Sequence, residues 1–192
     1  MIITTINNID LKFETDDKLF SPQNIDKGTL AMLSVVNFMD TDKVLDLGCG
    51  YGVVGIYAAK QISENNVFMS DSDVKAIDFT RKNAEINGVG GVQIIHSEGF
   101  NNIKESGFSI ILSNPPYHSD FSIPKHFIEK GFNRLNVGGK MYFVTKRKDW
   151  YKNKLTAIFG GVTINKIDEY YVFCSEKRNT QYAKCLSGGR FS

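Results

Sequence analysis

Apolar and polar residues follow one pattern at the start of the chain and another from residue 43 onward. Alternation through Leu11 and Phe13, after the turn-forming pair Asn7–Asn8, predicts a small N-terminal hairpin. A helix is expected next, from Lys27 to about Phe38, because apolar side chains recur there along one side. The chain therefore begins with a hairpin and a helix that precede any regular repeat of elements.

From residue 43 onward, short apolar runs alternate with amphipathic stretches. The runs predict strands at Lys43–Leu47, Asn66–Ser70, Val92–Ile95, Phe108–Ser113, Lys140–Thr145, Val162–Lys166 and Tyr170–Cys174. The stretches between them predict helices at Val53–Ile62, Asp73–Asn87, Lys125–Leu135 and Tyr151–Phe159. This alternation, with short connections, predicts an α/β protein whose parallel, doubly wound sheet has helices on both faces. Ligands of such sheets bind beyond the carboxyl ends of the strands.

The length and composition favour a single domain. The 192 residues, of which 42% are hydrophobic, suffice for one substantial core, and no linker or repeat divides them. We expect one domain over residues 1–178 and a flexible tail over residues 179–192, where apolar content is low. No basic N-terminal region precedes an apolar block, and no apolar stretch reaches membrane-spanning length, so a cytoplasmic location is expected.

Cysteine usage and charge say less about function than the pattern of elements does about fold. The three cysteines are scattered without CxxC spacing, which indicates a reducing compartment and predicts neither a disulfide framework nor a zinc site. The net charge of +2 is too small to identify a nucleic-acid partner. Its distribution is uneven, since residues 1–46 carry eight acidic and four basic side chains and the remainder carries about +6.

A glycine-rich loop, Asp46-Leu-Gly-Cys-Gly-Tyr-Gly52, follows the first strand of the repeat and opens a helix. Gly48, Gly50 and Gly52 allow a ligand to approach the backbone closely. A dinucleotide fits poorly, because Asp46 would repel a pyrophosphate and the GxGxG spacing departs from GxGxxG. A carboxylate suits a cation, and S-adenosylmethionine carries an ammonium and a sulfonium. Asp46 would serve such a ligand directly, through water or by fixing the loop.

Two further acidic residues follow the next strands of the repeat. Asp71 ends the second strand, 25 residues after Asp46, where its carboxylate can accept hydrogen bonds from both ribose hydroxyls. The alternative is that Asp71 caps the following helix, which is the role expected for Asp73. Glu98 lies just past the third strand and is placed to accept from the adenine amino group. The alternative for the loop is a tight turn without a ligand. Such a turn does not require three glycines and these acids together, so a ligand site is favoured.

An Asn-Pro-Pro-Tyr element follows the apolar strand Phe108–Ser113. The lone pair of a conjugated amine is delocalised, and two acceptors for its hydrogens, the side-chain oxygen of Asn114 and the carbonyl of Pro115, favour a tetrahedral nitrogen. Pro115 and Pro116 restrict the backbone and remove two donors. Tyr117 can stack on a flat base, and His118 adjoins the same pocket. The alternative is an ordinary proline turn with a surface tyrosine.

The basic segment 140–154 has two interpretations that remain open. Lys146, Arg147 and four other lysines, interleaved with aromatic residues, can hold RNA through phosphate contacts and stacking. They can equally form a solvated loop and helix face, with Trp150 packed into the core. The three histidines lie far apart without metal-ligand spacing, so no metal is predicted.

Taken together, DLGCGYG at Asp46–Gly52, the acid Asp71 and NPPYH at Asn114–His118 resemble class I methyltransferases, specifically the small-domain family of ribosomal RNA guanine-N2 methyltransferases. The resemblance covers most of the chain and includes FSPQNIDKGT at Phe20–Thr29, LNVGGKMYFV at Leu135–Val144 and the region of Tyr170–Tyr171. It implies a Rossmann-like sheet of seven mostly parallel strands with the last strand antiparallel, and S-adenosyl-L-methionine as cofactor. It also implies that residues 1–26 form the hairpin and a segment that closes over the cofactor, with Thr29 in the cofactor site.

The family resemblance implies methyl transfer to the exocyclic amine of a guanine in ribosomal RNA. The chain departs from the family in lacking the additional N-terminal methyltransferase-like domain of larger members, and in having Tyr117 and Glu98 where Phe and Asp or Asn are common. The chemistry of the Asn-Pro-Pro-Tyr element equally serves adenine-N6 and protein glutamine methylation. A noncatalytic module that binds cofactor or RNA is a further alternative, although such a module has no need of fixed acceptors for an amine.

Overall fold

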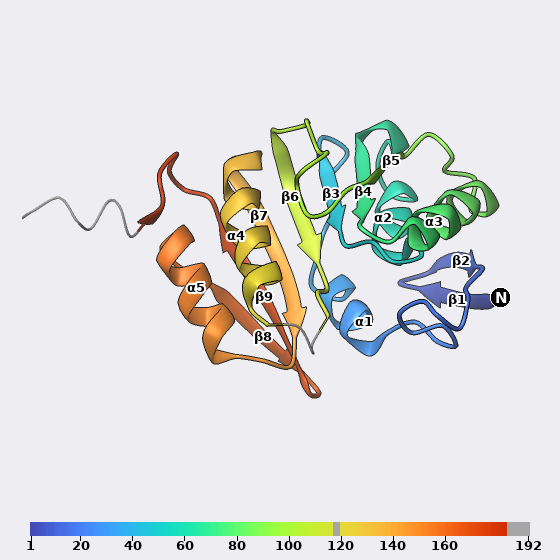
Figure 1. Cartoon of the computed structure of the whole chain (residues 1–192), viewed down its shortest axis with the longest axis horizontal. Helices are drawn as coiled ribbons and strands as arrows, with labels where there is room; N and C mark the ends of the chain where they lie inside the picture. Colours follow the sequence, from blue (N-terminus) through green and yellow to red (C-terminus); the bar gives the residue numbers. More distant parts are fainter. Residues whose placement is uncertain (117–119, 184–192) are drawn as a thin grey trace, which may run out of the picture.

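The computed structural model describes residues 1–116 and 120–183, which form a mixed seven-stranded sheet flanked by helices (Figure 1). The strand order is β5-β4-β3-β6-β7-β9-β8. Strands β5, β4, β3, β6 and β7 pair in parallel, and β9 runs antiparallel to both of its neighbours, so that β8 has the same direction as the first five. The strands are β3 (Val44–Leu47), β4 (Val67–Asp71), β5 (Gln93–His96), β6 (Phe108–Ser113), β7 (Leu135–Thr145), β8 (Thr163–Ile167) and β9 (Tyr170–Glu176). The fold class predicted from the sequence is confirmed, including the antiparallel last strand.

Helices cover both faces of the sheet. Successive strand residues point to opposite faces, so that Tyr142 and Val144 join the apolar cluster under α1 to α3, while Phe143 joins the cluster under α4 and α5. Because both faces are buried, the strands read as continuous apolar runs. The helices are α1 (Lys27–Leu33), α2 (Val53–Ala59), α3 (Val74–Ile86), α4 (Ser122–Arg134) and α5 (Asp149–Phe159), with a 3-10 turn, η1, at Glu64–Asn66.

The predicted N-terminal hairpin is present as β1 (Ile2–Ile6) and β2 (Ile9–Phe13). Its two turn residues, Asn7 and Asn8, have φ angles of 47° and 67°, the left-handed geometry that matches the twist of a two-residue hairpin. Two asparagine side chains, one in α3 and one at its C-cap, bind the backbone at and just after β2. Asn87 bonds both the N–H and the carbonyl of Lys12, at 3.0 and 2.7 Å, and Asn83 bonds both groups of Glu14, at 2.7 and 2.9 Å.

Four element boundaries differ from the sequence prediction by three residues or more, among them the end of α2, which lies at Ala59 instead of Ile62. α1 ends at Leu33 instead of continuing to Phe38, because the Ser34 hydroxyl donates to the carbonyl of Ala31, which competes with further helix. α4 begins at Ser122, before Pro124, since proline is tolerated in the first turn of a helix. β7 begins at residue 135 instead of 140, and its pairing with β6 is irregular over these extra residues.

Two predictions reach residues that the structure does not describe. Tyr117 and His118 lie outside the described residues, as does most of the expected tail, residues 184–192. Within the described part of the chain, no helix is long and apolar enough to span a membrane.

Candidate active site

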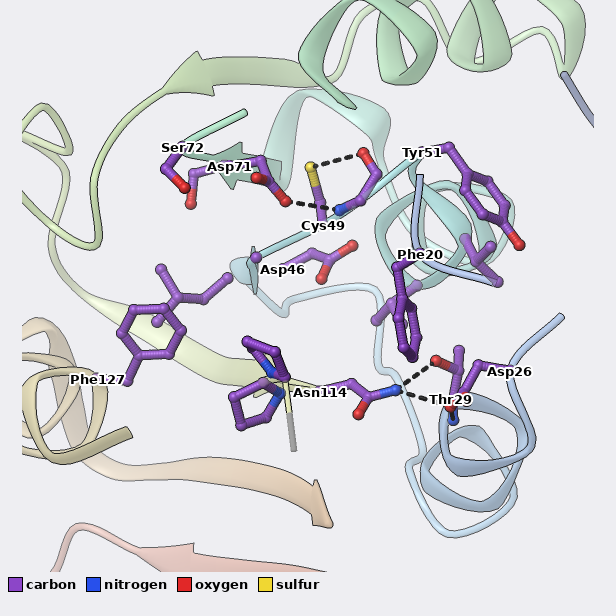
Figure 2. A pocket seen from close by; sticks show the side chains of 18 of the residues that line it. Phe20, Asp26, Thr29, Asp46, Cys49, Tyr51, Asp71, Ser72, Asn114 and Phe127 are labelled. Atoms are coloured by element: carbon purple, nitrogen blue, oxygen red, sulfur yellow. Dashed lines mark hydrogen bonds between the residues drawn. The ribbon is translucent and has the colours of Figure 1, made fainter. Parts of the chain in front are cut away.

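A cavity of about 280 Å³ opens beyond the carboxyl ends of β3, β4 and β6 (Figure 2). The order of the strands reverses between β3 and β6, and ligands of open α/β sheets bind in the crevice at such a point. The lining comes from seven segments that are distant in sequence. These are Phe20–Ser21, the α1 start with Asp26 and Thr29, the glycine loop with the start of α2, Ser70–Ser72, Ser97 with Gly99, Asn114–Pro116, and α4 with Ile123 and Phe127.

The glycine loop forms one wall of this cavity. Gly50 has a φ of +57°, and a Cβ atom built on it would meet no atom within 4 Å, so the loop backbone is open to a ligand there. Gly52 has a different task. A Cβ on Gly52, whose φ is +102°, would lie 3.0 Å from Ile56 and 3.2 Å from both Met69 and Thr80. Gly48 and Gly50 therefore line the cavity, whereas Gly52 allows α2 to start close against the sheet.

Asp46 lies at the base of the cavity with only 3% of its surface exposed. Its Oδ2 atom accepts a hydrogen bond of 2.8 Å from the N–H of Gly55, in the first turn of α2. Burial raises the pKa of Asp46 to about 7, with a smaller contribution from the negative charge of Asp71. The hydrogen bond to Gly55 ties the strand end before the loop to α2, and the roles of Asp46 toward a ligand stay predictions.

Asp71 fastens the tip of the same loop to β4. Its two carboxylate oxygens accept hydrogen bonds of 2.9 Å, one from the N–H of Gly50 and one from the N–H of Asp73. Burial raises the pKa of Asp71 above its usual value. Asp73 caps α3, as predicted, by accepting from the N–H of Lys75. The ribose contact of Asp71 stays a prediction, for which its place in the cavity wall is suitable.

The side chain of Asn114 is held by the first turn of α1. Its amide nitrogen donates to Oδ2 of Asp26 at 2.8 Å and to the Thr29 hydroxyl at 3.0 Å. Figure 2 shows the amide oxygen pointing away from these two acceptors. Pro115 is buried and Pro116 is exposed, and both line the cavity. Thus the two expected acceptor groups, Asn114 and Pro115, stand at the end of β6 beside the glycine loop.

The charges of the lining distinguish between classes of ligand. Asp26, Asp46 and Asp71 are part of the wall, and no basic side chain is among its described residues. Three carboxylates would repel a pyrophosphate and attract a cation. A ligand with a positive charge and hydroxyl groups therefore fits this cavity better than a dinucleotide does.

The family is decided by comparison with known proteins. The model of the methyltransferase small domain matches residues 10–174. The chain belongs to this family. All the segments that line the cavity fall within the matched range.

Relatives of this small-domain methyltransferase include proteins with a named activity. Ribosomal RNA small subunit methyltransferase C of Actinobacillus pleuropneumoniae (serotype 7, strain AP76) is 33% identical over 165 residues, which are 82% of this chain and 50% of that protein. The chain spans about half the length of the ribosomal RNA methyltransferases that it matches. The uncharacterised protein YbxB of Bacillus subtilis is 28% identical over 178 residues, 90% of this chain and 89% of its own length.

A solved structure shares the fold closely. The T. thermophilus 16S rRNA N2 G1207 methyltransferase (RsmC), in complex with AdoMet and guanosine, superposes with a TM-score of 0.85 at 26% sequence identity. The match covers 92% of this chain and 50% of that one. The small-domain methyltransferase fold thus extends over nearly all of the present chain.

Several predicted site residues of the methyltransferase domain lie away from the cavity. Glu98 is exposed and does not line it, although the neighbouring residues Ser97 and Gly99 do. Lys146 and Arg147 are exposed just after β7 and are also not among the lining residues. The roles expected for these three residues stay predictions. Within residues 1–116 and 120–183, no group of three or more His, Cys, Asp or Glu residues is placed to hold a metal ion.

The structure also adds cavity residues that sequence reasoning missed. Asp26 is the N-cap of α1, and only its position before Lys27 signalled a cap. Ile123 and Phe127 contribute an apolar wall from α4, and half-exposed Phe20 lies over the opening on the α1 side (Figure 2). An amphipathic helix gives no sequence signal for which of its apolar residues faces a ligand instead of the core.

Proposed function

We propose that this chain is an S-adenosylmethionine-dependent N-methyltransferase that acts on an exocyclic amino group, with guanine N2 of ribosomal RNA as the acceptor. The observation that carries the proposal is the Asn114 amide. It is oriented by Asp26 and Thr29 at the end of β6, next to a cavity whose walls are glycine-rich and acidic. Family membership and the guanosine in the T. thermophilus structure support the same conclusion.

The cavity fits the methyl donor in size and in chemistry. Its volume of about 280 Å³ is near the lower end of the range for small-molecule sites, roughly 300–1,000 Å³. Asp71 would accept from the ribose hydroxyls, and the negative charge of Asp46 would favour the cationic methionine part. Phe127 and Ile123 would contact the flat adenine ring. When bound, S-adenosylmethionine supplies a methyl group on a sulfonium, and the demethylated cofactor is a neutral thioether.

The residues after β6 prepare the acceptor nitrogen. The Asn114 side-chain oxygen and the Pro115 carbonyl each accept a hydrogen bond from the amino group of the substrate. These two bonds favour a pyramidal nitrogen whose lone pair points at the methyl group. The nitrogen forms its new bond to the methyl carbon as the bond between carbon and sulfur breaks. One proton then leaves the cationic nitrogen for water, so no side-chain base is required. Asn114 and Pro115 thus act by hydrogen bonding and position.

RNA is the proposed partner, and residues 146–148 are proposed to contact it. Arg147 lies over the ring of Phe121, 5.0 Å from its centroid, and Lys148 lies over Tyr171 at 5.6 Å. Trp150 is half-buried, packs against the apolar cluster under α4 and α5, and stacks on Phe121 with centroids 4.4 Å apart, so it joins this surface to the core. Exposed cations beside aromatic faces suit phosphates and unpaired bases. With a ribosomal substrate, the protein would work in the cytoplasm.

A single labelling experiment tests the proposed acceptor. The protein is incubated with radiolabelled methyl donor and, in parallel, with unmodified ribosomal subunits, naked ribosomal RNA, DNA and protein extract, followed by analysis of the labelled residue. Label in N2-methylguanosine is expected. Label in methyladenine or methylglutamine would overturn the guanine assignment. Absence of label despite measurable cofactor binding would overturn the enzymatic role.

Asn114→Ala is the matched catalytic control for that experiment. It should abolish labelling and leave cofactor affinity within about threefold of the parent, because Asn114 is proposed to act on the acceptor. Equal activity in this variant would refute the role of the amide.

A further inference from the structure

One carboxylate next to the proposed catalytic amide takes no direct part in the methyl transfer described above. Asp26 and Asn114 are 88 residues apart in sequence, and Oδ2 of Asp26 lies 2.8 Å from the amide nitrogen of Asn114. The same oxygen accepts from the N–H of Thr29 at 2.9 Å, and the Thr29 hydroxyl lies 3.0 Å from the Asn114 nitrogen. The first turn of α1 therefore surrounds one end of the amide.

A carboxylate beside an amide determines which way round the amide stands. An ionised carboxylate only accepts hydrogen bonds, so the nitrogen of Asn114 has to face Asp26. The reversed amide would place its oxygen against a negative charge in a half-buried site, where charges interact more strongly than in water. The correct orientation presents the amide oxygen on the side opposite Asp26, as a hydrogen-bond acceptor.

The carboxylate also changes the strength of that acceptor. Hydrogen bonds to ionised groups are roughly twice as strong as neutral ones. Withdrawal of the N–H protons toward Asp26 shifts electron density through the conjugated amide onto its oxygen, and chains of hydrogen bonds polarise one another in this manner. We infer that Asp26 is a positioning residue that orients the Asn114 amide and strengthens its oxygen as an acceptor for the substrate amine.

This inference rests on the proposed function and competes with two simpler roles. Asp26 caps α1, and asparagine or serine would cap it about equally well. Asp26 also lines the cavity, and the second simpler role is that of a ligand for the ammonium group of the methyl donor. The three roles differ in what they predict, because a cap affects stability, a cofactor ligand affects cofactor affinity, and a positioning residue affects turnover.

The kinetic test uses Asp26→Asn. The variant retains a cap, but its amide can donate to Asn114 and so stabilise the reversed orientation. We expect kcat to fall roughly 10–100-fold, the size of effect seen when the outer partner of a metal ligand is removed. The cofactor Kd and the KM for RNA should stay within about threefold. A drop in cofactor affinity with unchanged kcat at saturation would overturn the inference in favour of a cofactor ligand, and unchanged kinetics would overturn it in favour of a cap.

Two further variants control for folding and for loss of charge. Asp26→Ser keeps a capping oxygen but is too short to reach Asn114, so the same loss of kcat is expected even if the asparagine variant folds poorly. Asp42→Asn makes the same chemical change just before β3, at the end of the strands opposite the cavity. There Asp42 accepts from the N–H of Met39 and from the Ser109 hydroxyl, both at 2.7 Å. Its kcat should equal that of the parent.

A spectroscopic readout separates this inference from the proposed function. In a 1H–15N spectrum of side-chain amides, the Asn114 pair is identified by its loss in Asn114→Ala. Its protons should lie downfield in the parent and move upfield in Asp26→Ser, because a charged acceptor is removed. Unchanged Asn114 resonances would overturn the inference even if the protein methylates guanine. If the parent transfers no methyl group at all, the proposed function fails while the resonances still report on the amide.

Discussion

The buried carboxyl of Asp46 makes the stability of the protein depend on pH. Its pKa is about 7 in the folded protein against 3.8 for an ordinary aspartate. Because the folded state holds the proton more tightly, the resulting stability is fully present below about pH 3.8 and is lost as pH rises to about 7. Asp46→Asn removes the titration but keeps an oxygen that can accept from Gly55.

The size of the effect follows from the shift. About 3 pKa units at 1.36 kcal/mol each correspond to roughly 4 kcal/mol of stability. The side-chain nitrogen of the new asparagine would need a partner, and its absence costs about 1–3 kcal/mol at every pH. This cost is the same at every pH, so it does not affect how the free energy of unfolding changes with pH. The free energy of unfolding of Asp46→Asn minus that of the parent should therefore increase by roughly 4 kcal/mol between pH 4 and pH 8.

Urea unfolding of both proteins across this pH range measures the difference directly. Comparison with the parent cancels the other titrating groups, provided that the m values agree. Calorimetry at pH 8 should at the same time show weaker binding of the methyl donor to the variant, since a negative charge is missing from the cavity. A difference in unfolding free energy that stays flat with pH would refute the reasoning about Asp46.

Three further substitutions test other contacts. Gly55→Ala places a methyl group 2.6 Å from Met69 and should lower the free energy of unfolding, measured in urea, by about 1–3 kcal/mol. In Gly161→Ala the methyl group meets open space, so the free energy of unfolding should change little. Equal effects of the two substitutions would contradict the packing argument. Asp71→Ala should weaken the affinity for the methyl donor roughly 10–100-fold by calorimetry, and unchanged affinity would exclude the ribose contact. Lys177 donates to two backbone carbonyls at the end of α4, both at 2.8 Å. Lys177→Met should therefore lower the free energy of unfolding in urea by about 1–3 kcal/mol. A smaller loss would show that water replaces the ammonium group as the donor.

The sequence predicted the order of elements because the relevant signals are local. Apolar runs, the Asn7–Asn8 turn and the glycine loop each act within a few residues, and all three appear in the structure as expected. The boundary of α1 was less accessible, since the helix ends through a bond of Ser34 to a carbonyl three residues back. A serine in that position is compatible with either outcome.

The candidate site was predictable where one strand end carries the chemistry, as at Asp46, Asp71 and Asn114. The contribution of Asp26 was not, because its partner lies 88 residues away and only the packing of α1 against the sheet brings them together. Glu98 shows the opposite case. Its place after a strand suggested a cavity residue, but the chain turns there so that Ser97 and Gly99 face the cavity and Glu98 faces solvent.

The asparagine pairs that hold the N-terminal hairpin bear on how the protein is made. The hairpin leaves the ribosome before α3 does, but a lone two-stranded hairpin is at best marginally stable. The side chains that bind Lys12 and Glu14 are 75 and 69 residues further along. The hairpin therefore makes these four hydrogen bonds only after the residues of α3 and its C-cap have been synthesised. Asn83 also donates to the carbonyl of Tyr51, so a single side chain of α3 ties the chain that follows the hairpin to the glycine loop, and newly made hairpin and loop depend on the same residue.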